Sequence, residues 1–176
     1  DAEVDAAFLD GELNEKVRND LTAIVSRLRR PLAIRSSSLL EDASHQPFAG
    51  VYSTHMLAND HIDLDVRLAR LEEAIKLVYA STYHKGAKAY VASTPSNIED
   101  ERMAVVIQEL VGREVNGRFY PHISGAARSR NHYPVAPLKA EDGIAAVCIG
   151  LGRQVASGEK CLRFSPGQPK RIHQFH

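Results

Sequence analysis

The stretch Leu32-Ala33-Ile34-Arg35-Ser36-Ser37-Ser38 decides how the rest of the chain is interpreted. Its apolar residues predict a short buried strand over residues 32–34. Small hydroxyl residues after such a strand are typical of loops that contact ligands. Arg35 leads into this loop, and its planar guanidinium suits phosphate oxygens because it can donate two parallel hydrogen bonds. The stretch therefore predicts a buried strand that ends at an anion-binding loop.

Two interpretations of Arg35 remain open from the residues alone. In the first, Arg35 binds a phosphate, Ser36 adds a hydroxyl donor, and the more distant Gly50 lets a backbone amide approach the same anion closely. In the second, Arg35 forms an ion pair with Glu41 or Asp42 and holds a loop in place.

Helices are expected on either side of this stretch. Residues 11–30 carry apolar side chains at steps of three and four, which indicates an amphipathic helix that Pro31 ends. Residues 65–80 show the same pattern more strongly, and Asp63 or Asp65 can cap that helix. A shorter helix is expected over about residues 84–92.

Two further strands are expected in the first two thirds of the chain. Residues 51–54 follow a turn at Gly50, and residues 103–110 are almost continuously apolar, which predicts a strand buried on both faces. Gln108 and Glu109 are polar residues at the end of this strand. The backbone there can bind the edge of an adenine, and the Gln108 side chain can bond a base or a sugar. The alternative is a strand that simply emerges into solvent at Gln108.

The last third of the chain is expected to contain mainly hairpins and turns. Asn116-Gly117 predicts a hairpin turn. Residues 141–151 show apolar residues at helical spacing, although a buried strand is also possible, and Gly150-Leu151-Gly152 predicts a tight turn or a helix end. The strands expected here are residues 118–123, residues 126–132 as their partner, and residues 161–164. The order predicts an α+β protein with a mixed or antiparallel sheet flanked by helices.

The composition is that of a soluble globular protein with one domain or two small lobes. Of the 176 residues, 44% are hydrophobic and 25% are charged, and Lys+Arg and Asp+Glu are 22 each. This balance creates no net field to attract nucleic acid or an anionic membrane, and no apolar run approaches the roughly 20 residues that span a bilayer. Cys148 and Cys161 lie in apolar contexts and are expected as small buried side chains in the reducing cytoplasm.

Metal and nucleotide motifs of the common kinds are missing from the sequence. The eight histidines are scattered, without cysteine or acidic partners at the spacing of zinc sites. The chain has no Gly-x-x-x-x-Gly-Lys-Ser/Thr run, and the glycines near residue 150 lack the context of a dinucleotide fingerprint. We therefore expect no metal ligands within this chain.

Four blocks of the sequence belong together. They are Leu32-Ala33-Ile34-Arg35-Ser36-Ser37 with Glu41-Asp42 and Phe48-Ala49-Gly50, residues 74–81, residues 103–111, and Gly150-Leu151-Gly152 with Val155 and Gly158. In this order they resemble the phosphoenolpyruvate synthase and pyruvate phosphate dikinase family, in its N-terminal phosphoenolpyruvate/pyruvate-binding domain. The match is strongest over residues 30–165, and no single block carries it.

The resemblance implies that residues 1–176 form part of an ATP-grasp nucleotide-binding domain, in which ATP and its Mg²⁺ lie between two lobes. In the family this domain phosphorylates a histidine on a carrier domain of the same polypeptide, and the phosphohistidine then serves pyruvate or another acceptor. Arg35 is the candidate catalytic residue, since it would contact the ATP phosphates. By motif match, the candidate ATP-binding residues are Arg35 and Ser36, Gly50 and Thr54 on the phosphate-covering loop, and Gln108, Glu109 and Val111 near the adenosine.

The chain also departs from the family pattern. Arg153 stands where the family usually has Glu, and Gly158-Glu159-Lys160 replaces the usual Pro-Asp. The chain lacks the glycine-rich segment with its Lys before the first helix, the Asp-x-Glu and Gln-x-Arg segment after Phe164 that holds the metal, and the carrier-histidine motif. Because Asp1 is not Met, we expect a piece of a longer polypeptide that is inactive on its own.

Two functions follow as alternatives. The first is the ATP-binding part of a phosphotransferase similar to phosphoenolpyruvate synthase, which would phosphorylate a carrier histidine on another domain. The second is a non-catalytic nucleotide-sensing or interaction module within a signalling protein, which the departure at Arg153 leaves open. Flanking sequence with the carrier histidine and metal carboxylates would favour the first, and a sensory domain without them the second.

Overall fold

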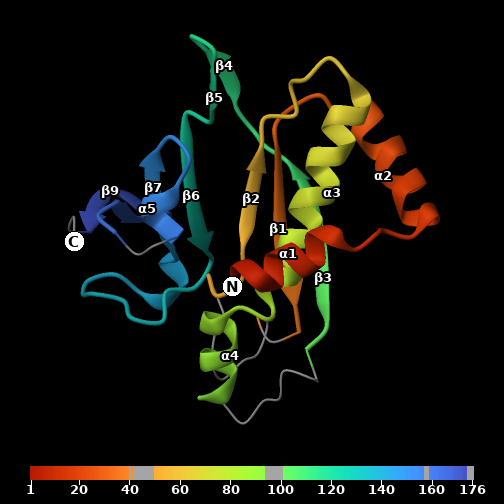
Figure 1. Cartoon of the computed structure of the whole chain (residues 1–176). Helices are drawn as coiled ribbons and strands as arrows, with labels where there is room; N and C mark the ends of the chain where they lie inside the picture. The colour runs from red at the N-terminus through yellow and green to blue at the C-terminus, as the bar shows by residue number, and fades with distance from the viewer. Residues whose placement is uncertain (40, 42–49, 94–100, 157–158, 174–176) are drawn as a thin grey trace. The chain divides into compact units, whose positions relative to one another are not determined.

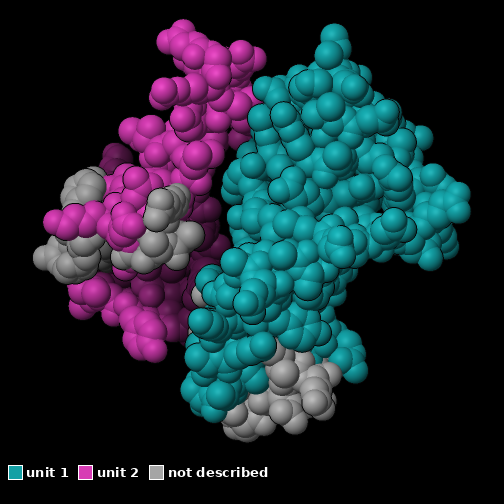
Figure 2. Space-filling model, in the orientation of Figure 1, with its two compact units in different colours: residues 1–110 teal, residues 111–176 magenta. Residues whose placement is uncertain are grey.

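The computed structural model describes residues 1–39, 41, 50–93, 101–156 and 159–173 (Figure 1). Its contacts divide the chain into two units, residues 1–110 and residues 111–176, which Figure 2 shows in different colours. Each unit combines helix with antiparallel strands, so the expected α+β class is confirmed. None of the described helices is both long enough and apolar enough to cross a membrane.

Unit 1 contains a three-stranded sheet in the order β2-β1-β3, and both pairings are antiparallel. Its described strands are β1 (Leu32–Ser38), β2 (Thr54–Leu57) and β3 (Met103–Glu109). Its described helices are α1 (Ala2–Asp10), α2 (Glu15–Arg27), α3 (Leu64–Ser81) and α4 (Lys85–Ala92).

One face of this sheet forms the core of unit 1 together with helices α2 and α3 (Figure 1). Leu32 and Ile34 of β1 pack there against Val25 of α2 and against Leu71 and Val78 of α3, and all five are fully buried. Burial of side chains of this size contributes about 1.5–3 kcal/mol each. From β1 this core cluster takes the alternate residues Leu32 and Ile34, while Ala33 between them is buried on the other side of the strand.

The strands differ from the sequence expectation in length and burial. β1 continues through Ser38 rather than ending at Ile34, so Arg35 and the serines lie in the strand and not in a loop. β3 is confirmed as a strand, but burial on both faces is wrong because Ala104, Val106 and Gln108 are exposed. Among the described elements, α2 and α3 pack against one side of the sheet, so β3 alternates between half-buried residues on that side and exposed residues on the other.

The helix expected over residues 11–30 is confirmed as α2 with narrower limits, and the separate helix α1 before it was not predicted. α1 ends before Gly11, and α2 begins after Asn14, whose side chain accepts a hydrogen bond of 2.9 Å from the Lys16 amide. Asn14 thereby satisfies an amide that has no partner within the first turn, and it caps the start of α2. The helices expected over residues 65–80 and 84–92 are confirmed as α3 and α4, and Asp63 caps α3.

Unit 2 contains a hairpin and a four-stranded antiparallel sheet in the order β6-β7-β8-β9. Asn116 and Gly117 both have positive φ angles, 53° and 73°, as a two-residue hairpin turn requires, so this prediction is confirmed. The described elements are β4 (Arg113–Val115), β5 (Arg118–Tyr120), β6 (Ile123–Arg128), the 3-10 turn η2 (Ala140–Asp142), β7 (Ile144–Ile149), α5 (Arg153–Ala156), β8 (Leu162–Ser165) and β9 (Gln168–His173).

Three expectations for unit 2 are corrected. Residues 118–123 are not one strand, because β5 ends at Tyr120 and β6 begins at Ile123. Residues 126–132 do not pair with them, since β6 pairs with β7. Of the two readings of residues 141–151, the strand is correct. Cys161 is buried as expected, Cys148 is half-buried, and both thiols are free.

Candidate functional site

The side of the sheet β2-β1-β3 that faces away from α3 carries three of the predicted site residues. Arg35 lies in the central strand, opposite Thr54 of β2 and opposite Val106 of β3. Gln108 lies two positions further along β3, opposite Ala33. Facing residues of antiparallel strands project to the same side, so Arg35, Thr54 and Gln108 share one face, and all three are exposed. We call this surface, with Ser37, Met56, Ala104 and Val106, the open face.

Arg35 has no acidic partner on this face among the residues that the structure describes. Within the part of the chain that the structure describes, its side chain makes neither an ion pair nor a hydrogen bond. Its guanidinium therefore keeps all its donors available for an anion. Pairing with Glu41, one of the two alternatives from the sequence, is wrong, and Asp42 lies outside the described residues.

Glu41 is held instead by the serines on the opposite side of β1. The Ser36 hydroxyl donates to Glu41 Oε1 at 2.8 Å, and the Ser38 amide donates to Glu41 Oε2 at 2.9 Å. The Glu41 amide in turn donates to Ser38 Oγ at 3.1 Å. Ser36 and Ser38 are buried, so they need these bonds, and the turn after β1 supplies them. Ser36 is thus turned away from the open face.

Glu109 and Val111 are also placed apart from Arg35. Glu109 lies opposite Leu32 on the core side of the sheet, and its Oε1 is 3.5 Å from Arg30 Nε. The Leu110 amide donates to the Pro31 carbonyl at 2.8 Å, which closes the end of β3 against the start of β1. Val111 is highly exposed and is the first residue of unit 2. Gln108 and Glu109, the polar residues at the end of β3, therefore lie on opposite sides of the sheet.

The segment from Gly50 to Thr54 connects to the open face through Thr54. Gly50 is exposed and has a φ of +81°, a conformation that favours glycine. Tyr52 is buried, and its hydroxyl donates to Glu101 Oε2 at 2.5 Å. Burial and the Glu101 carboxylate both raise the pKa of Tyr52 well above its ordinary value. The adjacent Phe48 and Ala49 lie outside the described residues.

The turn Gly150-Leu151-Gly152 follows β7 in unit 2. Gly150 and Gly152 have φ angles of +85° and +82°. A Cβ atom at Gly152 would lie 2.7 Å from Ser124 Cβ, so this glycine is needed for space as well as for its backbone angle. The Ser124 hydroxyl donates to the Gly150 carbonyl at 2.5 Å. The expected tight turn is confirmed, and its glycines have a local structural reason.

Metal ligands do not gather in the described residues: no group of three His, Cys, Asp or Glu side chains there is placed to hold an ion. The donor set of the open face is different. A guanidinium, a hydroxyl and a carboxamide suit the phosphates, the sugar and the base of a nucleotide rather than a bare cation.

Comparisons with known proteins agree with this chemistry. A family described as "Pyruvate phosphate dikinase, AMP/ATP-binding domain" matches residues 1–170. The chain is also similar to the protein named uncharacterized phosphotransferase YvkC of Bacillus subtilis (strain 168), with 29% identity over 158 residues, 88% of this chain and 17% of that protein. The chain thus spans less than a fifth of that relative's length. It belongs to the family of pyruvate phosphate dikinase AMP/ATP-binding domains.

Proposed function

We propose that this chain is the ATP-binding part of a phosphotransferase similar to phosphoenolpyruvate synthase, and that Arg35 binds the ATP phosphates. Membership of an AMP/ATP-binding family and similarity to a protein named as a phosphotransferase support the nucleotide and the reaction class. The ATP-grasp arrangement, a carrier histidine on another domain as the acceptor, and a cytoplasmic location complete the proposal.

The observation that carries it is the unpaired guanidinium on the open face. Glu41, the carboxylate that could have paired with Arg35, bonds to Ser36 and Ser38. Arg35 lies beside Thr54 instead. Two N–H groups of Arg35 and the Thr54 hydroxyl would then donate to phosphate oxygens.

Each residue would act by positioning and by neutralising charge. Phosphoryl transfer requires little covalent chemistry from the protein, so donors that hold the phosphates in one orientation supply most of the effect. Gly50 would offer its amide to the phosphates, and Gln108 would bond the base or the sugar. Mg²⁺ bound with ATP would neutralise further phosphate charge, held by carboxylates that are not among the described residues.

The test is ATP binding and self-phosphorylation of the intact protein. Arg35→Ala removes up to two charge-assisted hydrogen bonds of about 1.5–3 kcal/mol each, so ATP affinity should fall roughly a hundredfold or more. Acid-labile phosphohistidine, detected with labelled ATP, should disappear. Arg35→Lys keeps the charge but loses the two-point geometry. Its ATP affinity and its phosphohistidine signal should lie between those of the wild type and of Arg35→Ala.

Arg70→Ala is the matched control, because Arg70 is an exposed arginine on α3, away from the open face. It should leave binding and labelling unchanged. Phosphorylation that persists in Arg35→Ala would overturn the role of Arg35. ATP binding that depends on Arg35 but never leads to a phosphohistidine would favour the nucleotide-sensing module.

A further inference from the structure

The segment from Gly50 to Thr54 carries two of the proposed phosphate ligands, and residues outside it hold it at two of the three positions between those ligands. Tyr52 is held through its side chain and Ser53 through its backbone amide. The first contact comes from Glu101, two residues before β3, and the second from Ser81 at the end of α3. The position of Thr54 beside Arg35 therefore depends on residues distant in the sequence.

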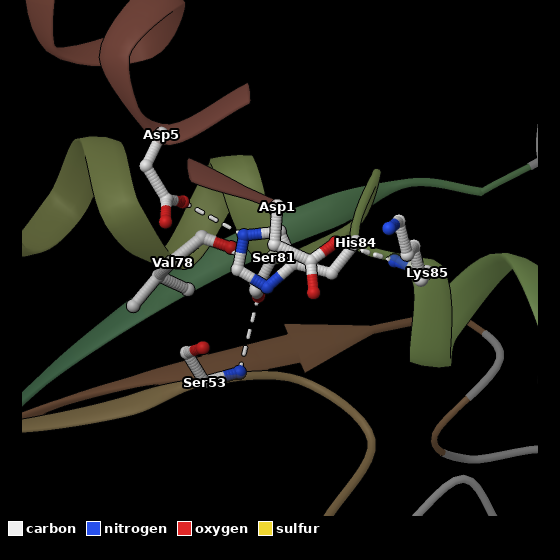
Figure 3. Close-up of polar contacts among 7 residues, drawn as sticks. All are labelled: Asp1, Asp5, Ser53, Val78, Ser81, His84 and Lys85. Carbon is white, nitrogen blue, oxygen red and sulfur yellow. Dashed lines mark hydrogen bonds and ion pairs between the residues drawn. The ribbon is translucent and has the colours of Figure 1, made fainter. Parts of the chain in front are cut away.

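Ser81 is the anchor from α3, and Figure 3 shows it between the helix and the segment. Its hydroxyl donates to the Val78 carbonyl at 2.6 Å, and the same oxygen accepts from the Ser53 amide at 3.0 Å. The side chain is 1% exposed, so water does not compete for either bond. Because its one hydrogen is committed to Val78, the oxygen presents a lone pair to Ser53 in a fixed direction.

Glu101 is the second anchor. It accepts the Tyr52 hydroxyl at 2.5 Å on one carboxylate oxygen, and the amides of Leu39 at 3.1 Å and Arg102 at 2.8 Å on the other. Leu39 follows directly after β1, and Arg102 precedes β3. One buried carboxylate thus joins the end of β1 and the start of β3 to the segment that ends at Thr54.

The residues after Ser81 are fixed as well. His84 Nε2 lies 2.7 Å from Asp5 Oδ1, and the Lys85 amide donates to Asp1 Oδ1 at 2.7 Å. Figure 3 draws both contacts. These contacts attach α1 to the turn between α3 and α4. The residues that follow Ser81 are consequently bound to α1 and to the N-terminal residue Asp1.

We propose that Ser81, supported by Glu101, is a positioning residue for the nucleotide site: it holds the Ser53 amide so that Thr54 lies beside Arg35 at the phosphates. This inference rests on the proposed function, since it assigns a role at the same site. Ser81 does not touch the nucleotide in this scheme and acts only through Ser53 and Thr54.

A double-mutant cycle in the intact protein separates positioning from general stability, with Mg-ATP affinity measured by calorimetry. Ser81→Ala loses one neutral hydrogen bond to the segment, and we expect about two- to tenfold weaker ATP binding. In a Thr54→Val background the same change should have an effect of less than about twofold, because the residue through which Ser81 acts has already lost its hydroxyl.

Two further variants make the interpretation specific. Ser26→Ala is the matched control: Ser26 makes the same kind of bond to a carbonyl three residues earlier, Ala23 at 2.9 Å, but in α2. It should leave ATP affinity unchanged. Glu101→Ala should weaken binding, whereas Glu101→Gln should restore most of it, because the amide oxygen still accepts from Leu39 and Arg102 and the amide nitrogen can donate to the Tyr52 oxygen.

The outcomes are distinguishable. An equal effect of Ser81→Ala in both backgrounds, in a protein that binds ATP through Arg35, would overturn the positioning role and leave the proposed function intact. No ATP binding by the unaltered protein would overturn both. An effect that Thr54→Val removes, together with rescue by Glu101→Gln, would support Ser81 as a positioning residue.

Discussion

Tyr52→Phe is expected to destabilise the fold by an amount that depends on pH in a defined direction. The change keeps the buried ring and removes the hydroxyl that donates to Glu101 Oε2. The amides of Leu39 and Arg102 still bind the other oxygen, so one bond to a buried carboxylate is lost. Such a bond is worth about 1.5–3 kcal/mol. Near neutral pH, the free energy of unfolding should therefore fall by about 2 kcal/mol.

The sign of the pH dependence follows from the pKa of Tyr52. The unfolded chain ionises this phenol near pH 10, whereas in the folded protein burial and Glu101 raise its pKa well above that value. Above about pH 10 the unfolded wild type has lost a proton that the folded wild type keeps, so wild-type stability falls with rising pH. The phenylalanine variant has no phenol at this position, so its stability does not show this decrease. The difference should shrink by about 1.4 kcal/mol per pH unit and vanish between about pH 11 and pH 12.

Urea unfolding of the 176-residue chain, followed by far-UV circular dichroism because the chain has no tryptophan, measures this difference. Tyr133→Phe is the control, since the Tyr133 side chain is 89% exposed, and it should match the wild type at every pH. A destabilisation that stays constant between about pH 8 and pH 11 would refute a raised Tyr52 pKa. A loss below about 0.5 kcal/mol at neutral pH would refute the energetic role of the Tyr52–Glu101 bond.

Two further outcomes are expected. Ile34→Ala should cost about 2–5 kcal/mol of unfolding free energy because Ile34 is fully buried, while Arg35→Ala at the next position should change it by less than about 0.5 kcal/mol; equal losses in chemical denaturation would contradict the assignment of faces. The isolated 176-residue chain should bind ATP weakly or not at all, since the lysine segment and metal carboxylates of the family are missing from its sequence; micromolar binding in calorimetry would contradict this expectation.

Much of the fold can be predicted from local patterns. The 3.6-residue periodicity of α3 and the Asn-Gly turn of the hairpin each depend on neighbours in the sequence, and both are confirmed. The limits of β1 could not be predicted in the same way. Ser36 and Ser38 look like loop residues, and their bonds to Glu41 help them to lie buried in a strand. Burial of β3 on both faces failed because nothing in Met103–Glu109 shows which faces the helices cover.

The sequence identified residues of the candidate site but not how they are arranged in the sheet. Arg35, Thr54 and Gln108 were identified from motifs, and the antiparallel register brings them to one face. Ser36 and Glu109 project to the other side because neighbouring residues of a strand alternate. The sequence did not indicate Tyr52, Ser81 and Glu101, which hold the segment that ends at Thr54. Their bonds join residues up to 62 positions apart, so no local pattern of the sequence indicates them.

The alternation in β1 has a genetic consequence. Ile34 belongs to the core and Arg35 to the open face. Neighbouring codons therefore encode a residue needed for folding and a residue proposed for ligand binding. Deleting or inserting one codon within Leu32–Ser38 exchanges the faces of every later residue in the strand, directing a charge inward and an apolar side chain toward the ligand. A frame-preserving deletion there should therefore remove folding and binding together. In a library of single-codon deletions, this stretch should be depleted more strongly than its individual substitutions, and the exposed hairpin at Asn116-Gly117 should tolerate such changes best.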